Sequence, residues 1–92
     1  MAVTVLIPTP LRAYTGNQES LELEGSNISE VLDNLTSTYG DLKKHLYNAE
    51  GQLRNFVNVY LGDEDIRHLD KGQETPLSGG ETISIVPSIA GG

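Results

Sequence analysis

The sequence predicts an α+β fold in which one main helix packs on one face of a mixed sheet of four to five strands. Two observations lead to this prediction. Short segments with apolar residues at every second position lie toward both ends of the chain, and one segment between them repeats its apolar residues with helical spacing. With 92 residues, we expect a single domain with one modest core.

The first two strands are expected at residues 3–7 and 19–24. The first segment is rich in β-branched residues and is followed by two prolines that end the strand. In the second segment Leu21 and Leu23 alternate with glutamates, so both leucines should point inward. Turn-forming residues at 14–17 join the two strands into a hairpin with a long turn.

The main helix is expected at residues 28–39. Asn27 followed by Glu30 fits a capping box, and Gly40 suits the position that follows a helix end. Residues 41–46 indicate a short second helix. The apolar stripe of the main helix follows the spacing i, i+3, i+4, i+7, i+11 and consists of Ile28, Val31, Leu32, Leu35 and Tyr39.

The remaining strands are expected at residues 56–61 and 82–86, with a very short strand at 66–67. Gly62 and Asp63 turn the chain after the first of these. Alternation along both longer strands assigns five residues to the core side of the sheet, namely Val57, Val59, Leu61, Ile83 and Ile85.

The folded domain is therefore expected to span residues 1–87, with residues 88–92 as a flexible tail that ends in Gly91 and Gly92. At average glycine content, two terminal glycines arise by chance in roughly one chain in 200. Glycine gives the backbone access to φ values that other residues avoid. We interpret the tail as functional rather than as a frayed end.

Composition excludes several classes of function. Without cysteine, the chain has no disulfide, thiolate metal site or cysteine nucleophile. The net charge is −7 and Lys43-Lys44 is the only basic pair, which disfavours nucleic acid as a partner. His45 and His68 are isolated and residues 63–65 read as a solvated acidic turn, so no metal site is predicted. No segment suits a membrane span or a signal peptide, and a cytoplasmic protein is expected.

The chain resembles a known family over essentially its whole length, with residues 41–54 matching loosely, and three segments carry the likeness. They run from Ile7 to Gly16, from Phe56 to Arg67 and from Val86 to Gly92. With the strand and helix order, they resemble the MoaD/ThiS family of bacterial sulfur carriers, which have the β-grasp (ubiquitin-like) fold. The combination is most similar to the CysO type, which supplies sulfur for cysteine synthesis. That branch differs from this chain at Gly62 and at Ser88-Ile89.

The resemblance implies a carrier that is a co-substrate of other enzymes, with no cofactor of its own. A partner of the ubiquitin-activating type would use ATP to adenylate the carboxylate of Gly92, and sulfur would then replace AMP to leave a thiocarboxylate. The acceptor enzyme would be cysteine synthase-like, or the large subunit of molybdopterin synthase. Five extended residues span up to ~17 Å, which is enough to enter a narrow channel of a partner.

The resemblance also implies a docking surface, because family members use the exposed sheet face beside the tail. It assigns docking roles to Leu6, Phe56, Tyr60, Val86, Ile89 and Ala90. Scattered exposed apolar residues would be the ordinary alternative. Other functions stay open as well: the small subunit of molybdopterin synthase, a carrier for thiazole synthesis, a ubiquitin-like modifier joined to lysines through Gly92, or a plain interaction module.

Overall fold

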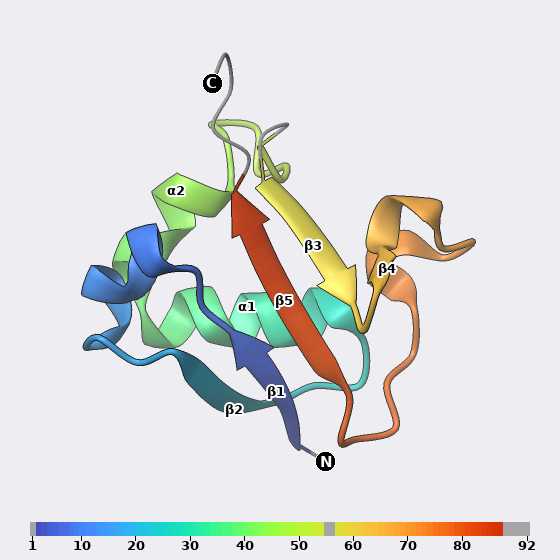
Figure 1. Ribbon diagram of the computed structural model, residues 1–92. Helices are drawn as coiled ribbons and strands as arrows, with labels where there is room; N and C mark the ends of the chain where they lie inside the picture. The colour runs from blue at the N-terminus through green and yellow to red at the C-terminus, as the bar shows by residue number, and fades with distance from the viewer. Residues whose placement is uncertain (1, 55–56, 88–92) are drawn as a thin grey trace.

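The structure is a computed structural model that describes residues 2–54 and 57–87. Within these residues a single sheet has the strand order β2-β1-β5-β3-β4, and α1 crosses one of its faces (Figure 1). Strands β1 and β5 are parallel, and the other neighbouring strands are antiparallel. This mixed sheet with one main helix confirms the expected β-grasp fold. The strands are β1 (Ala2–Leu6), β2 (Ser20–Glu24), β3 (Val57–Leu61), β4 (Glu64–Asp65) and β5 (Thr82–Pro87).

Helix α1 (Ile28–Thr38) begins as the sequence predicts. The side chain of Asn27 accepts a hydrogen bond of 2.8 Å from the backbone N–H of Glu30. The Glu30 carboxylate accepts a second hydrogen bond, also of 2.8 Å, from the backbone N–H of Ser26, the residue that precedes Asn27. Together these bonds satisfy two backbone donors at the start of the helix.

The chain continues from α1 through a short 3₁₀ helix, η2 (Gly40–Leu42), into α2 (Lys43–Leu46). The predicted second helix is therefore confirmed, although its first part is 3₁₀. Gly40 follows the helix end as expected, but it opens the next turn and does not have a positive φ.

The core lies between the sheet and α1. From the sheet it takes the inward residues of β1, β3 and β5, and from α1 the predicted stripe; Leu21, Leu23, Leu61 and Tyr39 are partly buried against it. The fully or nearly fully buried members from these elements are Val3, Val5, Val57, Val59, Ile83, Ile85, Ile28, Val31, Leu32 and Leu35. The assignment of inward residues from alternation is thus confirmed for the described strands.

Residues 9–15 differ from the expected loop, because they form a 3₁₀ helix, η1 (Thr9–Thr15). Pro10 lies in its first turn, where a missing N–H costs nothing. Leu11 and Thr15 are buried, so this segment covers one end of the core. Gly16 ends the helix in the left-handed conformation, with φ 65°.

The short strand also differs, since it lies at Glu64–Asp65 and not at 66–67. The tight turn after β3 has Gly62 at φ 61°, and it pairs Leu61 with Glu64 and Tyr60 with Asp65. Residues 66–68 instead form the 3₁₀ helix η3 (Ile66–His68), followed by η4 (Gly72–Glu74). Within the described ranges, no helix is long and apolar enough to cross a membrane.

Candidate functional site: the open sheet face

The face of the sheet opposite α1 carries a small apolar patch. Leu6 lies opposite Ser84 in the β1–β5 pairing, and Ser84 lies opposite Tyr60 in the β5–β3 pairing. Val86 follows two residues later on the same face of β5. Diagonal neighbours on one face are about 7–8 Å apart. We call these four residues, Leu6, Tyr60, Ser84 and Val86, the open-face patch.

The patch contains the two exposed large apolar side chains of the described residues. Leu6 is 41% exposed and Val86 is 45% exposed, and Tyr60 beside them is half-buried. Both side chains lie on the open face, on neighbouring strands and two residues apart in register. Because Val86 is followed by the last described residue, Pro87, the patch borders the point at which the predicted tail begins.

A fixed cation lies at the β4 side of the patch. The Arg67 guanidinium forms an ion pair of 3.2 Å with Asp65 and donates a hydrogen bond to the side chain of Asn58, which shares the outer face of β3 with Tyr60. The backbone N–H of Arg67 and then its guanidinium lower the pKa of the Asp65 carboxyl below its ordinary value. The Arg67 side chain remains 55% exposed and keeps donors for a partner.

The opposite edge of the open face is acidic. Glu22 and Glu24 are exposed on β2, opposite Thr4 and Ala2 of β1. The face therefore changes from carboxylates at β2, through the open-face patch, to the Arg67–Asp65 ion pair beside β4. The tight turn after β3 pairs Asp65 with Tyr60, and the glycine of that turn is the sequence signal from which this position of Asp65, and hence its ion pair with Arg67, could be inferred.

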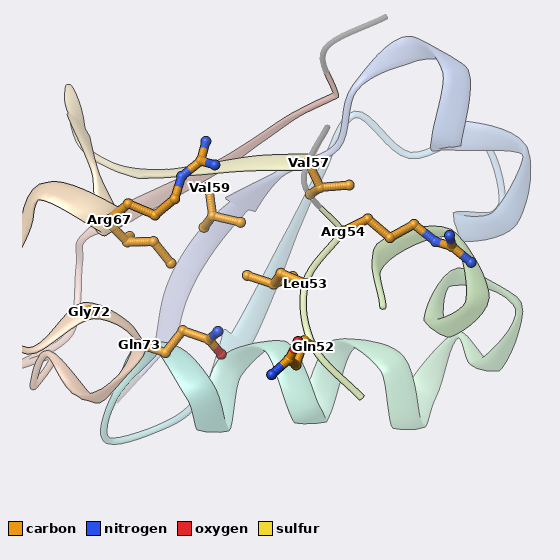
Figure 2. A pocket seen from close by; sticks show the side chains of 9 residues that line it. Gln52, Leu53, Arg54, Val57, Val59, Arg67, Gly72 and Gln73 are labelled. Carbon is orange, nitrogen blue, oxygen red and sulfur yellow. The ribbon is translucent and has the colours of Figure 1, made fainter. Parts of the chain in front are cut away.

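A pocket of about 350 Å³ lies on the other side of β3. Val57 and Val59 form its floor, and Gln73 borders it (Figure 2). The guanidinium groups of Arg54 and Arg67 point away from this pocket, toward α2 and toward the open face (Figure 2). Apart from these two arginines, the described residues that line the pocket are apolar residues, one glycine and two glutamines. None of these side chains can act as an acid, a base or a nucleophile.

The other predicted site residues lie outside the described residues, namely Phe56, Ile89, Ala90, Gly91 and Gly92. Of the residues predicted to dock a partner, the structure places Leu6, Tyr60 and Val86 on the same face of the sheet. In the part of the chain that the structure describes, no group of three or more His, Cys, Asp or Glu residues is placed to hold a metal ion.

The mixed sheet, the crossing helix and the open face define a ubiquitin-like β-grasp protein. The ThiS family model matches residues 5–92, and the chain belongs to the ThiS family. The sulfur carrier protein CysO of Mycobacterium tuberculosis (strain H37Rv) is 38% identical over 94 residues, which covers 100% of both chains.

Solved structures agree with this assignment. A chain in the crystal structure of the Amycolatopsis orientalis BexX/CysO complex superposes with a TM-score of 0.86 at 42% identity, covering 99% of this chain and 100% of that one. The small archaeal modifier protein SAMP1 of Methanosarcina acetivorans superposes with a TM-score of 0.87 at 31% identity, covering 99% and 96%.

The chain is therefore a sulfur carrier protein of the ThiS family, similar to CysO. Carriers of this family are not catalysts; they bind no cofactor and are activated by a partner enzyme. The predicted family and the prediction of a non-enzymatic carrier are confirmed.

Proposed function

We propose that the carboxylate of Gly92 carries sulfur as a thiocarboxylate, on a tail of residues 88–92 that extends from a domain of residues 1–87. The family match runs to residue 92, and the alignment with CysO covers the full length of both chains. The absence of cysteine supports the same site, because no side-chain thiolate can carry the sulfur.

The chemistry proceeds in two displacement steps. The Gly92 carboxylate attacks the α-phosphorus of ATP, so that pyrophosphate leaves and an acyl adenylate forms. A sulfur nucleophile supplied through the partner enzyme then adds to the carbonyl carbon and AMP leaves. A side chain on residue 92 would crowd both approaches, and Gly91 gives the adjoining backbone the freedom to fit a channel.

The open-face patch is the observation that carries this proposal. Val86 is exposed near the end of β5, the strand that precedes the tail, and Leu6 is exposed on the neighbouring strand β1. An enzyme that docks there would hold the tail close to its active site. Docking roles are also predicted for Phe56, Ile89 and Ala90, which lie outside the described residues. Arg67 adds a charged contact at its edge.

Intact-mass measurement tests the carrier chemistry. The full chain is incubated with the adenylating enzyme encoded in the same genome, ATP and a sulfide source. Replacement of one oxygen by sulfur adds about 16 Da, and a variant that lacks Gly92 should show no such species. A chain that gains no sulfur under these conditions, or a Gly92 deletion that remains active, contradicts the proposal.

The acceptor pathway we propose is cysteine synthesis, on the basis of the similarity to CysO. The thiocarboxylate form should transfer its sulfur to an activated serine derivative in the presence of a cysteine synthase-like enzyme. Transfer instead to a molybdopterin precursor, or to the thiazole-forming enzyme, would assign one of the alternative pathways.

A protein-modifier role is the second candidate. The small archaeal modifier protein 3 of Haloferax volcanii is 32% identical over 69 residues, which covers 75% of this chain and 73% of that protein. A modifier would be joined through Gly92 to lysines of other proteins. Isopeptide-linked ladders that depend on Gly92, detected in the native cells, would support this role.

A further inference from the structure

A groove of about 540 Å³ lies at the end of the sheet where β5 ends, between η1 and α2. Figure 1 shows η1 and α2 side by side at this end of the molecule. The apolar wall of the groove consists of Pro10, Leu11, Tyr14, Val57 and Pro87, and the polar wall consists of Lys44, His45 and Arg54. We call it the tail-root groove; the proposed function makes no use of it.

The charge of the groove is opposite to that of the protein. The chain has 13 acidic residues against 6 Lys and Arg. Among the residues that the structure describes, no carboxylate side chain lines the groove, whereas two of those six cations do. Lys43 and Lys44 are both exposed on α2. The Nε–H of Arg54 donates to the carbonyl of Lys44 at 3.0 Å, which holds the guanidinium at the end of α2. The result is a local cationic surface on an acidic domain.

His45 forms the boundary between the apolar and the polar wall of the groove. His45 packs its ring against that of Tyr14, with centroids 4.4 Å apart and an interplanar angle of 31°. Among the described residues, Nε2 of His45 is the buried side-chain nitrogen or oxygen that no hydrogen bond reaches. Buried polar atoms in native proteins are nearly always paired. This unpaired nitrogen is covered by the protein itself, so it marks a strained position in the wall beside the groove rather than a donor that a partner reaches.

We propose that the tail-root groove binds an acidic segment of the enzyme that takes the tail, with an apolar side chain flanked by carboxylates. This inference rests on the proposed function only for the identity of that enzyme. The apolar wall receives the side chain, and the two cations of the polar wall, Lys44 and Arg54, attract the carboxylates. Because Pro87 is part of the wall, an enzyme that encloses residues 88–92 passes beside the groove.

The net charge favours a short acidic peptide over a long polyanion. A nucleic acid would bring many phosphates close to the carboxylates on the rest of the surface, and repulsion would oppose its binding. A peptide segment confines its charge to the groove. The tail-root groove and the open-face patch would then be two separate contacts, one mainly electrostatic and one mainly apolar.

A peptide titration tests the groove without any enzyme. The ¹⁵N-labelled full chain is titrated with acetyl-Glu-Phe-Glu-amide at low salt and followed by amide chemical shifts. The largest shifts are expected at Tyr14, His45 and Val57. The uncharged acetyl-Gln-Phe-Gln-amide should bind several-fold more weakly. Lys44→Glu should weaken binding of the acidic peptide about fivefold, as expected for about 1 kcal/mol at an exposed site.

Lys71→Glu provides the matched control, because Lys71 is exposed and lies outside the groove. It makes the same charge change and should leave peptide affinity unchanged. Equal binding of the two peptides, or equal effects of the two substitutions, overturns the proposal. Displaced amide signals of residues 88–92 in Lys44→Glu without peptide would identify the tail of this chain as the occupant, and would also overturn it.

The enzyme measurement separates this inference from the proposed function. At low salt, Lys44→Glu should raise the KM of the activating enzyme for the carrier about fivefold. At about 0.5 M salt this increase in KM should be smaller, because dissolved ions screen the charges. An unchanged KM overturns the inference while adenylation itself persists. If wild-type chain is not adenylated at all, the proposed function fails, and the peptide titration still decides whether the groove binds an acidic segment.

Discussion

Replacing Leu6 and Val86 together by serine should weaken docking on the activating enzyme by about one to two orders of magnitude. Full burial of a large aliphatic side chain contributes about 1.5–3 kcal/mol. Since 41% of Leu6 and 45% of Val86 remain exposed for a partner to cover, their contributions are about 0.6–1.2 and 0.7–1.4 kcal/mol. The sum of about 1.3–2.6 kcal/mol corresponds to a factor of about 10 to 80 in Kd.

Isothermal titration calorimetry of the carrier against the activating enzyme measures this factor. The control is the double variant Thr4→Ser, Thr82→Ser. It shortens two side chains on the open face of β1 and β5, at residues that lie opposite each other and outside the open-face patch. It should bind with nearly wild-type affinity. Thermal unfolding of both variants checks that the fold is intact. A change in Kd of less than about threefold in a folded Leu6→Ser, Val86→Ser variant would refute the assignment of the patch, because it lies well below the range obtained from the exposed areas.

Three further predictions concern the fold itself. Leu35→Ala, at a fully buried position of α1, should lower the free energy of unfolding by about 2–5 kcal/mol in a denaturant titration. Gly25→Ala should destabilise by about 1–3 kcal/mol, because its Cβ would lie 2.8 Å from the backbone nitrogen of Val31; Gly40→Ala, with no heavy atom within 4 Å, is the control and should be close to neutral. The pKa of Asp65 is lowered in the folded state, so its contribution to stability is present above its ordinary value of 3.8 and is lost as the pH falls through the lowered value. Asp65→Asn should therefore be less stable than wild type at pH 7, and the difference should vanish in strong acid; a constant difference across pH would contradict this.

The elements with strong local signals were predictable from the sequence. The stripe from Ile28 to Leu35 has helical spacing, and the cap at Asn27 marks the start of α1 through its own side chain. The inward residues of β1, β3 and β5 follow from alternation, because a strand with one buried face has no other way to orient its side chains. These two patterns already imply the open face, and with it Leu6 and Val86.

The departures arise where one local signal is compatible with two structures. Pro10 breaks a strand but also fits the first turn of a helix, and burial of Leu11 decides for the helix η1. The position of the short strand β4 depends on the tight turn at Gly62. This turn pairs residues 64 and 65 with the end of β3, two residues earlier than the expected strand at 66–67. The tail-root groove was beyond sequence reasoning for a different reason, since its walls come from segments near residues 10–14, 44–54 and 87 that only the fold brings together.

The placement of β5 has a mechanical consequence for the use of the tail. This strand lies between β1 and β3, paired at three positions with the first and at five with the second. The hydrogen bonds of its antiparallel ladder run across the strand. A pull on residue 88 along the strand axis therefore loads these bonds together, in shear, instead of opening them one after another. If a partner enzyme pulls on the proposed tail, the pairing of β5 on both sides should therefore resist unfolding of the domain.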